Sequence, residues 1–419
     1  MGSAASAKIH VEHDFEVPGI TYTKSKMSNI AIVAITFNRP KSLERLLRSL
    51  LIANYPPEQI DLIISIDYSG CSSVKEIAVN TPWPHGAKKI IEHPINLGLR
   101  EHVLLCGDLS EQYENICVFE DDTFASPGFF LFARQAIEAY GMDDRMAGIS
   151  LYSNHWNQYV NKPFIPLDDG TDVYFMQVAA SWGQIWSRGS WRSFRAWMLR
   201  KADKDLYING LPVDVANWSS KSWLKFHNAY LVEENKYFVY PRISLSTNFS
   251  DAGEHASENT IYQVPLLAKA KDNYNLINFD KGIRYDAYYE SQNLTEISGI
   301  RQEEIDVSFY TNKPEMKRYR LTLERRNEKI VKSWGLRLRP IELNIINNIE
   351  GAEIKLYDTC GHCLREKYSI ENSLNIFLYY FQLSDKRELL RASLRLYWKA
   401  LKRRLLRTMV KRRKSDPQR

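Results

Sequence analysis

Four strands are expected within the first 120 residues, and stretches with helical periodicity separate them. Three are apolar runs at Ile30–Thr36, Asp61–Asp67 and Ile116–Phe119, and Ile90–Ile91 leads into the third strand in chain order. Strands this apolar are typical of a sheet that is buried on both faces. Their alternation with helices predicts an α/β fold with a mixed, mainly parallel sheet flanked by helices.

Polar side chains follow these strands, and three acids, Glu120, Asp121 and Asp122, follow the fourth. In open α/β sheets, ligands bind outside the carboxyl ends of the strands. The other polar residues at these ends are Thr36, Asn38, Arg39, Asp67, Asn96 and Arg100. Mn²⁺ and Mg²⁺ prefer oxygen ligands, and substrate phosphates often complete their shell. The triplet therefore predicts a metal–diphosphate site, with a solvated turn as the alternative.

The chain has 419 residues and a net charge of +6, and we expect four regions. Residues 1–26 lack periodicity and read as a flexible tail or an added extension, whereas 27–265 carry the α/β pattern. Residues 266–383 form an accessory region that begins a mostly helical C-terminal extension. Residues 384–419 hold fourteen Lys and Arg against three Asp and Glu, so the rest of the chain is net acidic.

The basic C-terminal segment has an apolar stripe at helical spacing. Its members are Leu390, Leu394, Tyr397, Leu401, Leu405 and Met409. A basic amphipathic helix of this kind can lie on an anionic membrane surface. A core-packed helix with a solvated basic face is the main alternative. A nucleic-acid partner is not expected, because the basic character is confined to this segment.

Five cysteines in a chain of this length do not indicate a disulfide framework. Cys360-Gly-His-Cys363 supplies only half of a zinc site. No apolar stretch reaches the length of a membrane span, and no signal peptide is recognised. These features predict a cytoplasmic protein that lies peripherally at the inner face of the membrane.

The segments at Val33–Pro40 and Cys117–Phe130 resemble the GT-A class of nucleotide-sugar glycosyltransferases. Glu-Asp-Asp followed by Pro-Gly-Phe-Phe is similar to N-acetylglucosaminyltransferase I-like enzymes. Trp182–Trp186 resembles the Gly-Trp segment of that family, and Pro241–Ser244 its later Pro-x-Ile-Ser run. The resemblance covers roughly residues 30–260, and the chain as a whole resembles bacterial polysaccharide glycosyltransferases.

The resemblance implies a role for each matching residue. Asp122 would contact Mn²⁺ or Mg²⁺, while Glu120 and Asp121 would hold the ribose, the donor sugar or metal-bound water. Asp67 would face the nucleoside, and Arg100 would neutralise the diphosphate. Donor contacts are also implied for Thr36, Asn38, Arg39, Asn96, Trp182 and Gly183. His255 falls where relatives have a loop that closes on the diphosphate or metal, although a surface-loop histidine is an equal reading.

The catalytic base departs from the family pattern. Inverting relatives place an Asp just before a Trp, but Trp223 follows Lys221-Ser222 here. Asp214 is the closest acid before a Trp and could fill the role from a shifted position, with Asp251 as the fallback. Asp214 could equally be an ordinary acid at a helix N-terminus.

The resemblance implies a metal-dependent, inverting transfer of a sugar from a nucleoside-diphosphate sugar to a glycan or lipid-linked glycan, in bacterial surface polysaccharide synthesis. A sugar-phosphate nucleotidyltransferase is one alternative, but Thr36–Pro40 lacks the Gly-rich loop expected after the first strand. A non-catalytic membrane-bound scaffold is another, and the intact acidic triplet counts against it.

Overall fold

The computed structural model describes residues 29–201, 206–251, 262–362 and 370–381, except for 295, 298, 311–312 and 315. Isolated positions between 387 and 401 are also described. The predictions for the tail at 1–26, for His255, for Cys363 and for most of 384–419 therefore lie outside the described residues.

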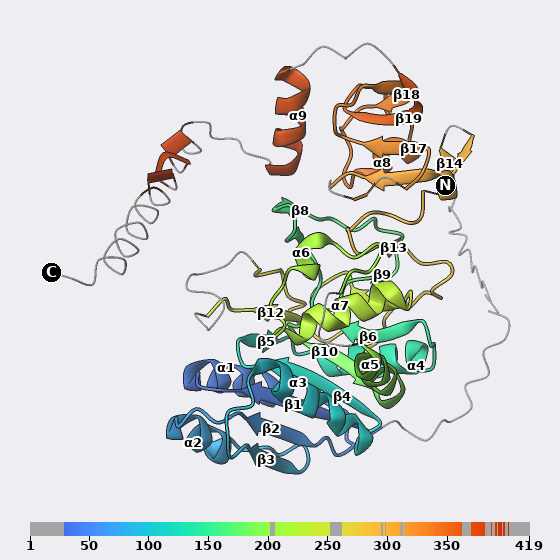
Figure 1. Ribbon diagram of the computed structural model, residues 1–419. Coiled ribbons are helices and arrows are strands. Elements are labelled where there is room, and N and C mark those ends of the chain that lie inside the picture. Colours follow the sequence, from blue (N-terminus) through green and yellow to red (C-terminus); the bar gives the residue numbers. More distant parts are fainter. Residues whose placement is uncertain are drawn as a thin grey trace, which may run out of the picture.

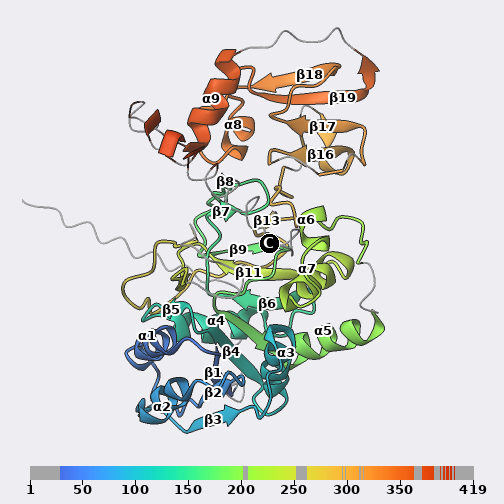
Figure 2. The ribbon, with the colours of Figure 1, turned by 60° about the vertical axis from the view of Figure 1, so that its left-hand side comes forward.

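A nine-stranded mixed sheet forms the centre of the larger lobe, shown at the bottom of Figures 1 and 2. In spatial order its strands are β13 (Arg284–Tyr285), β9 (Val173–Met176), β11 (Tyr237–Pro241), β6 (Met146–Ser150), β10 (Gln184–Ser187), β4 (Asn115–Glu120), β1 (Ile30–Thr36), β2 (Leu62–Ile66) and β3 (Lys88–Glu92). The four strands β4, β1, β2 and β3 are parallel, whereas β10 runs antiparallel to both β4 and β6. The predicted α/β sheet is thus confirmed.

Helices cover both faces of this sheet. They are α1 (Pro40–Leu51), α2 (Ser72–Asn80), α3 (Leu99–Asp108), α4 (Phe129–Tyr140), α5 (Arg188–Arg200), α6 (Val213–Ala216) and α7 (Trp223–Glu233), with a short 3₁₀ turn η1 (Leu109–Glu111). Side chains alternate along β1, so Ile32 packs toward α1, α2 and α4, while Val33 packs toward α3, α5 and α7. This two-sided burial explains why the strands are apolar throughout.

Two short strand pairs also lie in the larger lobe. β5 (Thr123–Ala125) pairs with β12 (Ser246–Asn248), and β7 (Trp156–Asn157) pairs with β8 (Lys162–Pro163).

The C-terminal lobe, residues 296–381, lies at the top of Figures 1 and 2 and is built on a second sheet. The sheet contains β16 (Ile305–Ser308), β17 (Tyr319–Thr322), β19 (Ile354–His362) and β18 (Glu328–Trp334) in that order. A short pair, β14 (Glu296–Ile297) with β15 (Ile300–Arg301), a 3₁₀ turn η2 (Gln302–Glu304) and helices α8 (Glu342–Ile346) and α9 (Ile370–Phe381) complete it.

The expectation of a mostly helical extension is therefore wrong for residues 305–362, which form a sheet with one short helix, α8, and it is met by α9. The pattern of β18 explains part of the error: only its last residue is buried and three consecutive positions are exposed, so its sequence lacks the regular alternation that marks a half-buried strand. β13, at residues 284–285, joins the main sheet although it lies beyond the expected boundary at residue 265. Among the described residues, none of the helices is long and apolar enough to span a membrane.

Candidate active site

The carboxyl ends of β1, β2 and β4 meet at one edge of the main sheet. Thr36 is the last residue of β1 and pairs in register with Ile66, while Ile35 pairs with Glu120. In-register parallel strands bring their following residues to the same level. A cavity of about 210 Å³ opens at this edge. The predicted residues that line it are Thr36, Asn38, Arg39, Asp67, Asn96, Glu120, Asp121, Asp122 and Asp251.

Arg39 bridges the last two acids of the triplet. One guanidinium nitrogen forms an ion pair with Asp121, and Nη1 lies 3.2 Å from Asp122 Oδ2. Thr36 Oγ1 donates a hydrogen bond of 2.8 Å to the other oxygen of Asp121. Asp121 is buried, and burial raises its pKa although the positive charge of Arg39 acts against that rise. The pair is thus held rigidly beside a fixed cation.

Asp67 organises the loop that enters α3. Its Oδ1 accepts hydrogen bonds from the backbone N–H groups of Tyr68 and Leu97, and its Oδ2 accepts one from Gly98 N at 3.0 Å. Asn96 Nδ2 donates to the backbone carbonyl of Tyr68 at 3.1 Å. The side chains of Asp67 and Asn96 both line the cavity. Their hydrogen bonds to the backbone also fix the loop that forms this part of the cavity wall.

Glu120 stands apart from the other two acids electrostatically. Burial and the charge of Asp122 raise its pKa to about 8, although Arg39 opposes the rise. The indole of Trp223, at the start of α7, interacts with this carboxylate and opposes the rise of its pKa. Trp223 is the tryptophan that lacks a preceding acid in the sequence, and the fold places it directly against the triplet.

His102 is a cavity residue that the sequence analysis missed. Its Nε2 lies 2.8 Å from the hydroxyl oxygen of Ser65, which also lies 3.2 Å from His93 Nε2. Burial lowers the pKa of His102 to about 4, so the ring is neutral at neutral pH. A signal was available, because His102 follows Gly98 by four positions and shares its face of α3.

Three of the residues predicted to contact the donor do not line the cavity. Arg100 donates a hydrogen bond of 2.9 Å to the carbonyl of Ser220 and lies over the ring of Phe226. Trp182 lines a separate aromatic pocket, and Gly183 packs against Phe119 and Ser246. The roles of Arg100, Trp182 and Gly183 toward a nucleotide sugar remain predictions. The cation that contacts Asp121 and Asp122 is Arg39.

The two candidate bases have different surroundings. Asp214 is the second residue of α6 and is exposed to solvent. Asp251 lines the cavity, forms an ion pair with Arg45 and accepts a hydrogen bond of 2.7 Å from Ser42 Oγ. Burial favours its neutral form, but the bonds from Arg45 and Ser42 outweigh burial and lower its pKa. Asp251 is therefore already engaged by a cation, whereas Asp214 does not line the cavity.

The donor set fits a divalent metal only partly. Asp122 Oδ1 is buried and accepts no hydrogen bond within the described part of the chain, so it can ligate a cation. Within those same residues, no group of three or more His, Cys, Asp or Glu side chains could hold a metal ion. One carboxylate together with ligand phosphates and water is nevertheless a usual arrangement for Mg²⁺.

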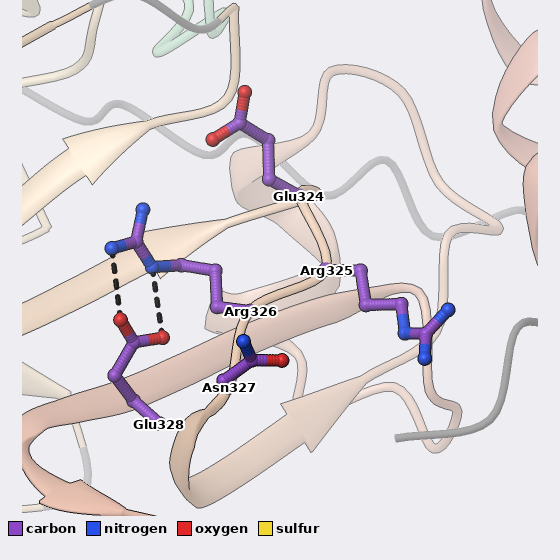
Figure 3. Close-up of a pocket in the computed structure, with 5 residues that line it drawn as sticks. All are labelled: Glu324, Arg325, Arg326, Asn327 and Glu328. Carbon is purple, nitrogen blue, oxygen red and sulfur yellow. Dashed lines mark hydrogen bonds and ion pairs between the residues drawn. The ribbon is translucent and has the colours of Figure 1, made fainter. Parts of the chain in front are cut away.

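A larger surface hollow, about 500 Å³, lies at the turn between β17 and β18 (Figure 3). Five consecutive residues line it, and Arg326 forms an ion pair with Glu328 there while Arg325 points away. All residues that line this hollow belong to one turn, so it does not bring together side chains from different helices or strands. It is therefore not a candidate site.

Comparison with solved structures finds glycosyltransferases, the class that the sequence resembles. TarS residues 1–349 from S. aureus are 15% identical, with 51% of this chain and 60% of that chain covered and a TM-score of 0.33. Mannosyltransferase PcManGT from Pyrobaculum calidifontis, in complex with GDP-Man and Mn²⁺, is 12% identical over 52% and 58% of the two chains, with a TM-score of 0.33. GalNAc-T7 with UDP, GalNAc and Mn²⁺ is 11% identical over 52% and 43%, with a TM-score of 0.36.

This chain thus spans about 60% or less of the length of these three solved chains. No protein-family model matches it, and no curated protein sequence does either. The likeness to the solved structures is remote. Any assignment of donor, metal and acceptor therefore has to be argued from the residues of this chain.

Proposed function

We propose that this protein is a metal-dependent glycosyltransferase that moves a sugar from a nucleoside-diphosphate sugar to a glycan acceptor. The observation that carries the proposal is the cavity at the carboxyl edge of the sheet. It combines Asp67, Asn96 and neutral His102 on one wall with Arg39 and the acidic triplet on the other. Binding of a nucleoside requires polar groups that form hydrogen bonds with it, and binding of a diphosphate requires positive charge held close to its oxygens.

Asp122 would hold the Mn²⁺ or Mg²⁺ through its free oxygen. Such an ion neutralises the charge that develops on a leaving diphosphate. Arg39 contributes positive charge at the same place, and its ion pair with Asp121 fixes the direction of its guanidinium. Glu120, with its raised pKa, can donate a hydrogen bond to a donor-sugar hydroxyl when protonated.

In the proposed reaction, an acceptor hydroxyl oxygen bonds to the anomeric carbon while the bond from that carbon to the diphosphate oxygen breaks. The hydroxyl proton passes to a carboxylate, for which we propose Asp214, with Asp251 as the alternative. A single displacement of this kind inverts the anomeric centre. The low pKa and existing ion pair of Asp251 favour Asp214.

We further propose a membrane-associated acceptor, of the lipid-linked glycan type used for bacterial surface polysaccharides, at the cytoplasmic face. The C-terminal lobe supports this attachment. Helix α9 exposes apolar side chains, among them Leu374 at 51% and Phe377 at 41%, and Tyr397 and Trp398 are also exposed. The strongly basic segment 384–419 follows α9 directly.

The test is incubation of the purified full-length protein with a panel of nucleotide sugars and Mn²⁺, followed by measurement of free nucleotide. Many transferases hydrolyse their donor slowly when water replaces the acceptor, so one donor should release nucleotide above background. The matched control is Asp144→Ala, an exposed acid that does not line the cavity. If no donor is hydrolysed or bound with or without metal, the proposal is wrong.

A further inference from the structure

A second, smaller pocket is lined by eleven residues, five of which carry aromatic rings. The Trp182 ring centroid is 4.8 Å from that of Tyr152 and 4.9 Å from that of Tyr262. Tyr152 also donates a hydrogen bond of 3.0 Å to the backbone carbonyl of Tyr262, which fixes the two rings relative to each other. The pocket measures about 50 Å³, room for several water molecules.

The polar groups of this pocket are uncharged. Asn154, Gln158 and Ser181 contribute to its wall, and its lining includes no Lys, Arg, Asp or Glu among the described residues. A phosphate or carboxylate would find no counter-charge here, so the pocket suits a neutral ligand. A ligand with an apolar face and hydroxyl groups at its edge matches aromatic rings bordered by amides.

One buried donor in the pocket has no partner. Trp156, on β7, lines the pocket, and its Nε1 is buried without a hydrogen bond in the described structure. An indole nitrogen can only donate. Leaving such a group unsatisfied costs about 1–3 kcal/mol, and a ligand hydroxyl oxygen would remove that cost.

Two links in the chain join this pocket to the acidic cavity. Trp182 precedes Gly183, which packs so closely on Phe119 that an added Cβ would lie 3.2 Å from the ring, and Phe119 directly precedes Glu120. Leu224 lines the pocket and follows Trp223, whose indole interacts with the Glu120 carboxylate. Gln184 pairs with Val118 in antiparallel register, so Trp182, two residues earlier, lies level with Glu120, and the aromatic pocket is next to the acidic cavity.

We propose that this aromatic pocket is the acceptor subsite and that it binds one neutral pyranose ring of the acceptor. The inference rests on the proposed function, because it takes the acidic cavity as the place of the donor. The sugar ring would pack along the edges of Trp182 and Tyr262, whose faces already contact each other, and one of its hydroxyl oxygens would accept a hydrogen bond from Trp156 Nε1. The pocket size limits the subsite to one ring, with the rest of the acceptor outside.

The test measures binding of methyl glycosides of glucose, galactose, mannose and N-acetylglucosamine to the full-length protein by saturation-transfer NMR. Tyr262→Ala removes one stacking ring, and Trp156→Phe keeps a ring but removes the buried N–H. Tyr207→Ala is the matched control, because this tyrosine is 89% exposed and does not line the pocket. Thermal unfolding of each variant checks its fold.

We expect at least one glycoside to receive saturation on the C–H protons of one ring face. Its dissociation constant should rise about tenfold in Tyr262→Ala and about fivefold in Trp156→Phe, with no change in Tyr207→Ala. Absence of binding by the whole panel at millimolar concentration, or equal binding by folded Tyr262→Ala and Trp156→Phe, would overturn the inference. Donor hydrolysis tests the proposed function separately. If hydrolysis is absent but pocket-dependent binding is present, the proposed function fails and the pyranose site stands.

Discussion

At the scale of single residues, the two neighbouring acids Asp121 and Asp122 differ in how many of their carboxylate oxygens are hydrogen-bonded. Asp121 is buried, and both its oxygens are engaged by Thr36 and Arg39. Asp122 shares Arg39 but keeps one oxygen free. The sequence could place both acids at a strand end. It could not show that Arg39 reaches back to them, since that contact depends on where α1 begins.

Asp122→Ala should abolish metal-dependent nucleotide binding and transfer while leaving the fold intact. The substitution removes the free carboxylate oxygen, and several kcal/mol of transition-state stabilisation should go with it. Asp121→Ala should instead lower the free energy of unfolding by about 3 kcal/mol, because it leaves the Arg39 charge without its buried partner. Nucleotide titration with and without Mn²⁺ and urea unfolding measure the two effects. Near-normal turnover of Asp122→Ala at saturating Mn²⁺ would contradict the assignment.

Asp214→Asn should lower kcat at least a hundredfold and leave donor affinity unchanged, because a base acts only in the transition state. Asp251→Asn should change kcat less, since Asp251 is already neutralised by Arg45. Initial rates at saturating donor, together with donor titrations, separate the two effects. A fully active Asp214→Asn beside an inactive Asp251→Asn would mean that the base was assigned to the wrong acid.

His227 on α7 is completely enclosed by aromatic rings, and neither ring nitrogen has a hydrogen bond in the described structure. Burial lowers its pKa from the ordinary 6.5 to about 3. Between these values the unfolded chain binds a proton that the folded chain does not, so stability falls as pH falls through this window. The slope is about 1.4 kcal/mol per pH unit.

His227→Phe should therefore be more stable than the wild-type protein at pH 5, and the difference should shrink toward pH 8. The phenyl ring fits among the same aromatic neighbours, and Phe194 already stacks at 4.3 Å. Thermal unfolding of both proteins from pH 5 to pH 8 gives the difference in their stability. The contributions of all other titrating groups cancel in this difference, because they are the same in both proteins. A constant difference across this range would show that His227 is protonated or hydrogen-bonded in the folded state.

At the scale of elements, the sequence predicted best where burial is two-sided. The runs that became β1, β2 and β4 were apolar throughout, so length and flanking turns sufficed to recognise them. The C-terminal sheet was missed because β18 has four charged or polar residues among its seven positions and mostly exposed side chains. His102 was overlooked for a different reason: it lies on a helix and not at a strand end, and its only signal was its spacing of four residues after Gly98.

Gly183, directly before β10, shows how an element can fix the site. Its φ is +92°, and an added Cβ would lie 2.8 Å from Ser246 Oγ, which is hydrogen-bonded to the carbonyl of Trp182. Gly183→Ala should lower the free energy of unfolding by about 3 kcal/mol, from the left-handed backbone and this contact together. Gly170→Ala is the control, because its φ is +80° but nothing lies within 4 Å. It should cost only about 1 kcal/mol. Equal losses in urea unfolding would show that contact with Ser246 is not limiting.

At the scale of the whole molecule, the two lobes share one apolar core. Tyr285, Phe164 and Tyr310 connect the aromatic rings of the main sheet to the C-terminal sheet. Helix α9 contacts this core through Tyr379, Tyr380 and Ile376. Its exposed apolar side chains are Ile370, Leu374, Phe377, Leu378 and Phe381. Such an exposed apolar face, followed by a basic segment, is typical of a surface that docks on an anionic membrane.

The full-length protein should sediment with vesicles that contain anionic lipid and remain in solution with neutral vesicles, whereas a version ending at Leu383 should bind much less. Each basic residue near an anionic surface contributes about 1 kcal/mol, and salt screens this attraction. A variant with Gln at Arg391, Arg395, Lys399, Lys402 and Arg403 keeps the apolar stripe and isolates the charge. It should bind anionic vesicles at least tenfold more weakly than the wild-type protein. If truncation and charge removal leave sedimentation unchanged, or if high salt does not release the full-length protein, the C-terminal segment is not the membrane contact.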